Sequence, residues 1–297
     1  MEKGLSNHSH PAPPIVLVIA GFDPSCGAGI AADLKTIAAH NGYGIAAVTA
    51  VTVQSTQGVL SVHAVPPATL RAQLDALADD VKPGAIKIGM LANRANAAIV
   101  AEFLERMKRT PIVLDPVIKP SSGGVELLDS AGVKFLGEDL LKLATVVTPN
   151  IAEAALLSGM EIKDVPGMEA AARKLVERGA RAVVIKGGHM EKPIDVLFDG
   201  TEILTLGGDQ VKTQNTHGSG CTFASAIAIQ LASGRPLRES VLLAKTYVQM
   251  AIEHGFAIGK GAGPLDHFYR VHQEPPARGV HEVPQHGMHS AAEPAAD

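Results

Sequence analysis

Residues 15–36 read IVLVIAGFDPSCGAGIAADLKT and join an apolar run to a glycine-rich turn and a segment of small residues. The run 15–21 has the length of a strand and no polar alternation, which is typical of a parallel strand covered on both faces. The turn at 23–29 follows directly, and 28–40 has the spacing of a helix. A strand, a tight turn and a helix form the repeating unit of α/β proteins.

The same alternation continues along the chain. Strands are predicted at 15–21, 45–54, 85–90, 112–115, 146–148 and 182–186. Helices are predicted at 28–40, 68–81, 93–109, 151–158, 168–178, 218–233 and 237–254. Residues 195–198 and 203–206, joined through Asp199 and Gly200, are expected to form a hairpin at the sheet edge. The sequence therefore predicts an α/β fold with a mostly parallel sheet.

Composition excludes several classes of protein. The chain has 297 residues, of which 46% are hydrophobic, so a full core can form and disorder is excluded as the main state. A net charge of −4 gives no electrostatic footprint for nucleic acid or an anionic membrane. The apolar runs stay far below the ~20 residues of a membrane helix, and residues 1–14 lack the apolar core of a signal peptide. Two distant cysteines favour a reducing compartment, so we expect a cytoplasmic protein.

Both ends of the chain differ in composition from the middle. Residues 1–14 and 272–297 are rich in Pro, His, Ala and Glu and are predicted to be disordered tails. Metal binding by the tail histidines is an alternative, but their irregular spacing favours solvated side chains. The histidines concerned are His8, His10, His272, His281, His286 and His289. Residues 15–271 show no linker and no internal repeat, which predicts one domain.

Several residues of possible chemical use stand at the carboxyl ends of the predicted strands. Gln54, Met90 and Asp115 end the second, third and fourth strands. Asn150 follows the fifth strand and Lys186 ends the sixth. Any one of them could serve only as a cap or turn residue. Because parallel strands bring their carboxyl ends to one edge of the sheet, the set together predicts a ligand site.

The segment 215–222, NTHGSGCT, precedes an apolar helix and predicts an anion-binding site. Gly218 and Gly220 let a ligand approach the backbone, and the first helical N–H groups lack internal partners. Charge on a transferring phosphoryl group would be stabilised there. The alternative is a plain helix cap made by Ser219 or Thr216. The chain has no G-x-x-x-x-G-K-[ST] phosphate loop, and 21–29 is not a dinucleotide fingerprint.

Cys221 lies at the start of the same helix. Thiol pKa values at helix N-termini commonly fall from ~8.5 to about 3.5–7.5, so a thiolate could accept a proton. The side chain could equally act by packing or hydrogen bonding. Cys26, in the other glycine-rich turn, is interpreted as structural.

These segments resemble the bacterial hydroxymethylpyrimidine/phosphomethylpyrimidine kinases of thiamine biosynthesis, within the ribokinase-like superfamily. The resemblance spans about 15–270 in the family's order. Its motifs are GFDPSCGAGIAADLKT (21–36), TAVTVQSTQGV (49–59), IKIGML (86–91), VLDPV (113–117), TPNIAEA (148–154), VVIKGGH (183–189), NTHGSGCT (215–222) and GKGAGPLDHF (259–268). It implies a three-layer α/β/α sandwich and a homodimer.

The resemblance also implies an activity: transfer of phosphate from MgATP to 4-amino-5-hydroxymethyl-2-methylpyrimidine, and then to its monophosphate. By the family pattern, Gln54 would bind the amino and ring-nitrogen edge of the pyrimidine. Asp33 and the backbone of Gly21 would complete the polar frame, and Met90 would pack on the ring. Cys221 occupies the place of an aspartate base in related sugar kinases.

The remaining site residues are implied on the side of the nucleotide. Asp115 and Glu153, with Asn150, would organise Mg²⁺ partly through water. Lys186 and Thr216 would face ATP, and Lys186 would neutralise phosphate charge. Catalysis would take place at the glycine-rich turn formed by Gly218, Ser219, Gly220 and Cys221.

The chain departs from the family pattern at a few positions. Cys26, Ala31, Ser55 and Ser219 replace the more usual Gly, Gln, Asn and Thr, and each leaves the backbone role intact. The loop 115–123 has Lys119 earlier than its family counterpart. That loop is expected to cover the substrates, so its variation bears on lid closure and the second phosphorylation. The alternative, which we favour, is a simple loop variant.

Two other functions are compatible with these residues. A pyridoxal-type kinase would share the scaffold, but Gln54 and Met90 argue against it. A catalytically silent pyrimidine-binding regulator would not require the charged groups at the strand ends.

Overall fold

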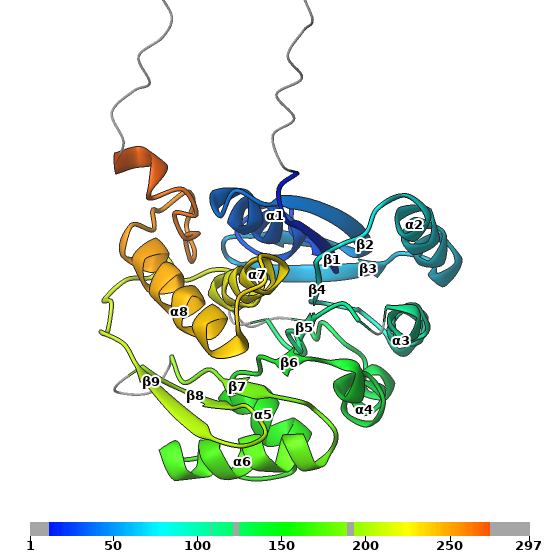
Figure 1. Ribbon diagram of the computed structural model, residues 1–297. Helices are drawn as coiled ribbons and strands as arrows, with labels where there is room; N and C mark the ends of the chain where they lie inside the picture. The colour runs from blue at the N-terminus through cyan, green and yellow to red at the C-terminus, as the bar shows by residue number, and fades with distance from the viewer. Residues whose placement is uncertain (1–11, 108, 121–124, 189–192, 274–297) are drawn as a thin grey trace, which may run out of the picture.

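The computed structural model describes residues 12–107, 109–120, 125–188 and 193–273 (Figure 1). The predicted disordered tails therefore lie almost wholly outside the described residues. His272 is one of the described residues, and its Nδ1 atom lies 2.8 Å from Asp266 Oδ2.

Nine strands form one sheet in the described part of the chain, in the order β3-β2-β1-β4-β5-β6-β7-β8-β9. Neighbouring strands from β2 to β7 pair in parallel, whereas β3, β8 and β9 pair antiparallel at the two edges. The strands are β1 (Ile15–Phe22), β2 (Tyr43–Ser55), β3 (Gly58–Ala64), β4 (Ala85–Ile88), β5 (Ile112–Leu114), β6 (Val146–Val147), β7 (Val183–Ile185), β8 (Ile194–Phe198) and β9 (Ile203–Gly207).

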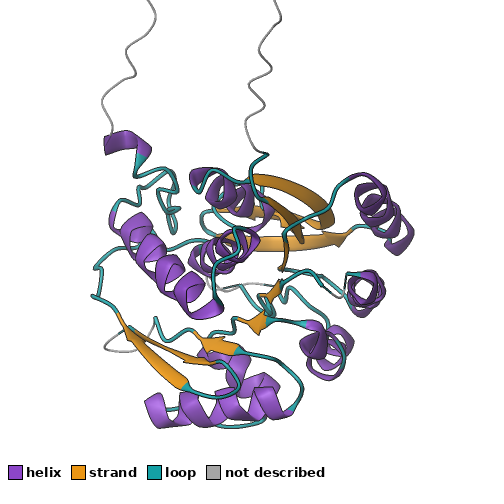
Figure 2. Ribbon diagram, in the orientation of Figure 1, coloured by secondary structure: helices purple, strands orange, loops and turns teal. Residues whose placement is uncertain are grey.

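Helices cover both faces of this sheet (Figures 1 and 2). Helices α1, α7 and α8 pack on one face and α2 to α6 on the other. The helices are α1 (Gly29–Ala39), α2 (Pro67–Asp80), α3 (Arg94–Arg106), α4 (Ser130–Glu138), α5 (Ile151–Ser158), α6 (Val165–Glu177), α7 (Ser219–Ala232) and α8 (Leu237–Glu253), with short 3₁₀ helices η1 (Leu140–Leu143) and η2 (Val271–Gln273). The predicted three-layer α/β/α architecture is confirmed.

Strand β1 shows why a central strand of this sheet has a continuous apolar run, with no alternation of polar and apolar residues. In β1, Leu17 and Ile19 belong to the core beneath α2 to α6. Val16, Val18 and Ala20 belong to the core beneath α1, α7 and α8. Successive side chains of a strand point to opposite faces, so a central strand buried on both faces must be apolar at every position.

Besides the two short 3₁₀ helices, one strand and one α-helix were not predicted from the sequence. Strand β3 is an antiparallel edge strand with Leu60 and His63 exposed, so it lacks the apolar run used to find the parallel strands. Helix α4 contains two glycines and is capped by Asp129, whose side chain accepts from Gly132 N at 2.6 Å. The hairpin predicted at 195–206 is confirmed as β8 and β9. No helix within the described ranges has the length and hydrophobicity needed to cross a bilayer.

Candidate active site

A cavity of about 500 Å³ lies at the carboxyl ends of the parallel strands. Every residue predicted for the site lines it except Asp33. The predicted lining residues are Gly21, Gln54, Met90, Asp115, Asn150, Glu153, Lys186, Thr216, Gly218, Ser219, Gly220 and Cys221. The fold thus brings Gly21 and Cys221, which lie 200 positions apart in the chain, to the wall of the same cavity.

The start of α7 has the form of an anion-binding site. Its cap residue is Gly218, with φ +84°, and no side chain caps the helix. The alternative of a cap made by Ser219 or Thr216 is therefore not what the structure shows. A Cβ atom at Gly218 would collide with the carbonyl oxygen of Gly27, so the close approach of the two turns requires glycine. Residues Gly218–Cys221 of this junction line the cavity, and the first turn of a helix has N–H groups without intrahelical partners.

A charged pair stands beside that helix start. Lys186 Nζ donates to Asp115 Oδ1 at 2.7 Å, and Thr148 Oγ1 donates to the same oxygen at 3.1 Å. Burial opposes the charge on Lys186, but the carboxylates of Asp115 and Glu153 raise its pKa overall. A Cβ at Gly220 would lie 3.1 Å from Lys186 Nζ, so glycine lets the ammonium group sit close to the helix end. The ammonium group of Lys186 therefore lies beside the start of α7 at the cavity wall.

Cys221 differs from the thiolate that its place at a helix start had suggested. Burial raises the pKa of its thiol to about 11, and the carboxylates of Asp33 and Asp115 act in the same direction. The nearby Lys87 ammonium lowers the pKa without reversing the effect. Cys221 is therefore a neutral thiol at neutral pH, because burial and the nearby carboxylates outweigh the Lys87 ammonium.

The acidic residues predicted for Mg²⁺ lie together and fit a hydrated cation. Glu153 forms a capping box with Asn150: Asn150 N donates to Glu153 Oε2, and Glu153 N donates to Asn150 Oδ1, both at 2.9 Å. Burial raises the pKa of Glu153 to about 7, although Lys186 lowers it. A cation would relieve this confined negative charge. No cluster of three or more His, Cys, Asp or Glu suited to a metal occurs among the described residues. Two carboxylates completed by water and phosphate are typical of Mg²⁺.

The opposite end of the cavity is apolar with a polar edge. Met90 belongs to a small buried cluster with Ala50, Val59 and Leu127. A Cβ at Gly21 would lie 2.9 Å from Met90 Sδ, so glycine leaves room for this side chain. This wall suits a flat, uncharged ring.

Asp33 is the one predicted site residue that does not line the cavity. The prediction placed it against the substrate, but its side chain is fully buried and lies outside the cavity lining. Lys87 Nζ donates to its two oxygens at 2.9 and 2.8 Å, and Ser225 Oγ donates at 2.7 Å. A carboxylate held in this way is a structural partner of Lys87. The sequence offers one sign of this role for Lys87, because a lysine within the apolar run 85–88 is unusual for a buried strand.

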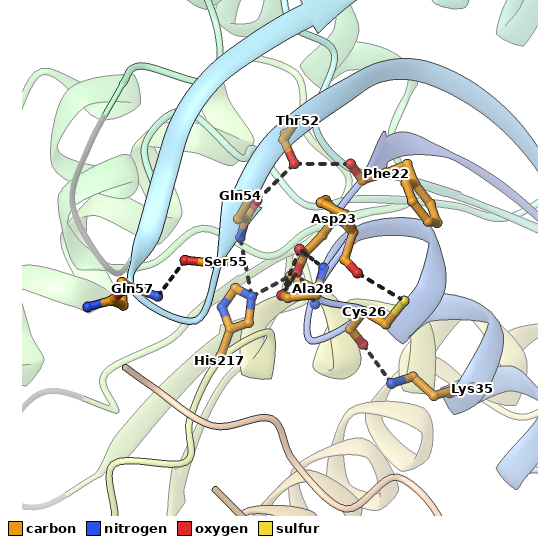
Figure 3. Close-up of polar contacts among 12 residues, drawn as sticks. Phe22, Asp23, Cys26, Ala28, Lys35, Thr52, Gln54, Ser55, Gln57 and His217 are labelled. Atoms are coloured by element: carbon orange, nitrogen blue, oxygen red, sulfur yellow. Dashed lines mark hydrogen bonds and ion pairs between the residues drawn. The ribbon is translucent and has the colours of Figure 1, made fainter. Parts of the chain in front are cut away.

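Two cavity residues, Asp23 and His217, were not among the predicted site residues (Figure 3). His217 Nε2 lies 2.8 Å from Asp23 Oδ2 and 3.3 Å from Gln54 Nε2. Both side chains are buried, and they come from the two glycine-rich turns. Their place within the two glycine-rich turns could have marked them as site residues. Their contact with each other depends on tertiary structure.

Comparison with known proteins gives the family. The chain matches the phosphomethylpyrimidine kinase family over residues 23–266. It belongs to this family. The resemblance seen in the motifs is thereby confirmed, and the fold is ribokinase-like, as in solved kinases of related sequence.

Relatives of the family agree over most of the chain. The chain is 45% identical to the hydroxymethylpyrimidine/phosphomethylpyrimidine kinase of Synechococcus elongatus, over 87% of this chain and 98% of the relative. It is 44% identical to a bifunctional thiamine biosynthesis protein of Geobacter sulfurreducens, over 85% of this chain, and spans only 52% of that protein. A Staphylococcus aureus pyridoxal kinase in complex with AMP-PCP and pyridoxal superposes with a TM-score of 0.80 at 35% identity, over 89% of this chain and 97% of that one.

The loop that departs from the family pattern is described only in part. Positions 121–124 lie outside the described residues. Lys119 lines the cavity, and its Nζ atom lies 3.4 Å from Glu126 Oε1 on the far side of the gap.

Proposed function

We propose that the protein transfers phosphate from ATP to the 5-hydroxymethyl group of 4-amino-5-hydroxymethyl-2-methylpyrimidine, and then to the resulting monophosphate. Membership of the phosphomethylpyrimidine kinase family supports both steps. The observation that carries the assignment is that Gln54 and the start of α7 line one cavity. A pyrimidine held at Gln54 can therefore direct its alcohol toward a phosphate held at Gly218–Cys221.

The ring-binding end supplies a bidentate partner. A glutamine amide offers one donor and one acceptor side by side, which matches an amino group beside a ring nitrogen. Met90 and its apolar neighbours would cover the ring. We expect Gln54 to set orientation and Met90 to exclude water.

The phosphate-binding end supplies charge stabilisation. The alcohol oxygen forms a bond to the terminal phosphorus of ATP as the bond to the bridging oxygen of ADP breaks. Phosphoryl transfer depends mainly on positioning and on neutralising the equatorial oxygens, which Lys186 and the α7 N–H groups can do. Mg²⁺, when held near Asp115 and Glu153, would neutralise further phosphate charge. Thr216 and Asn150 are proposed to face the nucleotide.

The alcohol proton does not require a strong base in this scheme. A loose transition state leaves the attacking oxygen protonated until late, so the proton can pass to the transferred phosphate. We propose that Cys221, as a neutral thiol, orients the hydroxyl group.

The direct test is product analysis. The purified protein with ATP, Mg²⁺ and the hydroxymethylpyrimidine is expected to give monophosphate first and diphosphate second. Gln54→Leu should lose most of its affinity for the pyrimidine while retaining ATP binding. No phosphorylated product from the wild-type protein would disprove the proposal, and unchanged pyrimidine affinity in the variant would remove Gln54 from the site.

A pyridoxal-type kinase is the second candidate, because pyridoxal kinases share this fold at 34–36% identity. Competition between pyridoxal and the hydroxymethylpyrimidine decides between them, and a higher kcat/KM for pyridoxal would favour the second candidate. Tight pyrimidine binding without ATP turnover would instead support a silent regulator.

We further propose a cytoplasmic homodimer that binds no nucleic acid. Cys26 and Cys221 are both free, which suits a reducing compartment. Light scattering on a sizing column gives the subunit number, and a monomer at micromolar concentration would contradict the dimer.

A further inference from the structure

Gln54 lies between two side chains that constrain its amide group (Figure 3). His217 stands on one side, with Nε2 at 3.3 Å from the Gln54 nitrogen. Thr52 stands on the other, with Oγ1 at 3.1 Å from the Gln54 oxygen. Turning the end of the side chain by 180° exchanges its oxygen and nitrogen, so these two neighbours decide which atom faces which side.

The proton on His217 is fixed by Asp23. The two Asp23 oxygens accept hydrogen bonds from Ser25 N at 2.8 Å and Ala28 N at 2.9 Å, in addition to His217 at 2.8 Å. Burial opposes the charge on Asp23, but the bonds from His217 and Ser25 lower its pKa overall. An ionised carboxylate only accepts, so His217 Nε2 carries a proton and donates it to Asp23.

A protonated Nε2 cannot accept a hydrogen bond from the Gln54 amide. With the amide nitrogen on that side, two N–H donors would face each other. The opposite orientation places the Gln54 carbonyl oxygen beside the positive N–H edge of His217. Electrostatics therefore favour oxygen toward His217.

The hydrogen bond from Thr52 to Phe22 is compatible with the same orientation. Its hydroxyl group has one proton, and Oγ1 lies 3.1 Å from both the Phe22 carbonyl oxygen and the end of Gln54. If the proton goes to Phe22, the hydroxyl lone pairs face Gln54 and need a donor. Gln54 nitrogen on the Thr52 side satisfies both partners, so the two neighbours agree.

The surroundings hold the His217 ring in place. A Cβ on Gly27 would collide with its ring, so glycine lets the ring pack closely against the first turn. His217 N donates to Gly263 O at 3.1 Å, and the residue is 8% exposed. The ring has little freedom to turn its nitrogen away from Asp23.

We propose that His217, held by Asp23, is a positioning residue that fixes the Gln54 amide and thereby makes the site select a 4-amino over a 4-oxo pyrimidine edge. The inference rests on the proposed function and names its basis of specificity. In the fixed orientation, Gln54 presents an acceptor on the His217 side and a donor on the Thr52 side. In the 4-amino pyrimidine, the amino group donates to the Gln54 oxygen and the unprotonated ring nitrogen accepts from the Gln54 nitrogen. In the 4-oxo pyrimidine, the carbonyl oxygen would face the Gln54 oxygen and the ring N–H would face the Gln54 nitrogen, so both contacts are mismatched.

The test compares 4-amino- and 4-oxo-5-hydroxymethyl-2-methylpyrimidine by calorimetric Kd without ATP and by kcat/KM. The wild-type protein should prefer the amino compound by about 10- to 100-fold, since the oxo edge leaves polar groups mismatched. His217→Phe keeps a ring but removes the donor, and should reduce this ratio at least about threefold, with KM changing more than kcat. His217→Gln places an amide nitrogen near the same point and should restore the preference.

Thr52→Val is the second variant, because it removes the other orienting partner without changing side-chain shape, and it carries the test if His217→Phe does not fold. It should also reduce the ratio. His63→Phe, at an exposed histidine of β3, is the matched control and should leave the ratio unchanged. If His217→Phe and Thr52→Val lower kcat/KM equally for both pyrimidines, the ratio between the two compounds is retained. That result would overturn the inference but leave the kinase assignment standing. Wild-type protein that phosphorylates neither compound would instead overturn the proposed function.

Discussion

Lys87 Nζ lies 2.8 and 2.9 Å from the two carboxylate oxygens of Asp33, and both residues are fully buried. The pair joins β4 to α1, and Ser225 of α7 donates to the same carboxylate. Burial opposes the charge on Lys87, but the carboxylate of Asp33 raises the pKa of Lys87 overall, so this lysine keeps its charge in the folded protein. The buried pair of Lys87 and Asp33 therefore connects α7, through Ser225, to α1 and to β4 of the sheet.

Removing one member of this pair should be strongly destabilising. Lys87→Met is expected to lower the free energy of unfolding by about 3–5 kcal/mol, because it leaves a buried carboxylate unpaired. Asp33→Leu combined with Lys87→Met should recover part of the loss. Urea denaturation measures both. Lys174→Met, at a surface pair with Glu177, is the control and should change little. Full stability of Lys87→Met would show that the pair is dispensable.

Gly220→Val should damage turnover more than binding. The added side chain would crowd Lys186 Nζ and cover the first N–H groups of α7. We expect kcat to fall about 100- to 1,000-fold, as for loss of an oxyanion-type donor. Gly207→Val is the matched control, since a Cβ at Gly207 meets no atom within 4 Å. Retained kcat in Gly220→Val would place the anion site elsewhere.

Cys221→Ala should cost less than the loss of a general base. A thiol whose pKa is about 11 stays protonated at neutral pH, so we expect at most about a tenfold fall in kcat, against 100- to 10,000-fold for a true base. The pH profile of kcat between about pH 6.5 and 9 should have the same shape in the variant and the wild type. Cys26→Ala serves as the control. A profile limb that disappears with Cys221 would contradict the neutral-thiol interpretation.

Glu153 should make stability depend on pH when Mg²⁺ is removed with chelator. Burial raises its folded pKa from 4.5 to about 7, so between these values the folded state binds more protons than the unfolded state. The free energy of unfolding should therefore fall as pH rises through this window, by on the order of 3 kcal/mol. Glu153→Gln keeps a capping oxygen and should flatten the dependence.

Thermal melts at pH 5.5 and 7.5 measure this effect. Added Mg²⁺ should raise the Tm of the wild type more at pH 7.5, because the cation and the proton compete for the carboxylate. Glu161→Gln, at an exposed pair with Lys163, is the control. Identical pH dependence in Glu153→Gln and wild type would assign the effect to another group.

The sequence predicted the fold where local patterns carry the information. Continuous apolar runs identified the parallel strands, because a strand covered on both faces has no polar alternation. The boundaries of α5 at 151–158 were predicted as observed, since Asn150 and Glu153 form a capping box within four residues. Strand β3 and helix α4 lacked such signals: one is half-exposed, and the other contains two glycines.

By itself, the sequence determined the parallel strands of the sheet, the two glycine-rich turns and the family, since all three depend on residues close together in the chain. Tertiary structure alone decided what Asp33 and Cys221 do. A carboxylate has the same letter in the sequence whether it faces a ligand or a buried lysine, and the acidity of a thiol at a helix start depends on burial and on neighbouring charges that only the fold places. The contact between Asp23 and His217 joins turns nearly 200 residues apart, so only the folded chain could place the proton that orients Gln54.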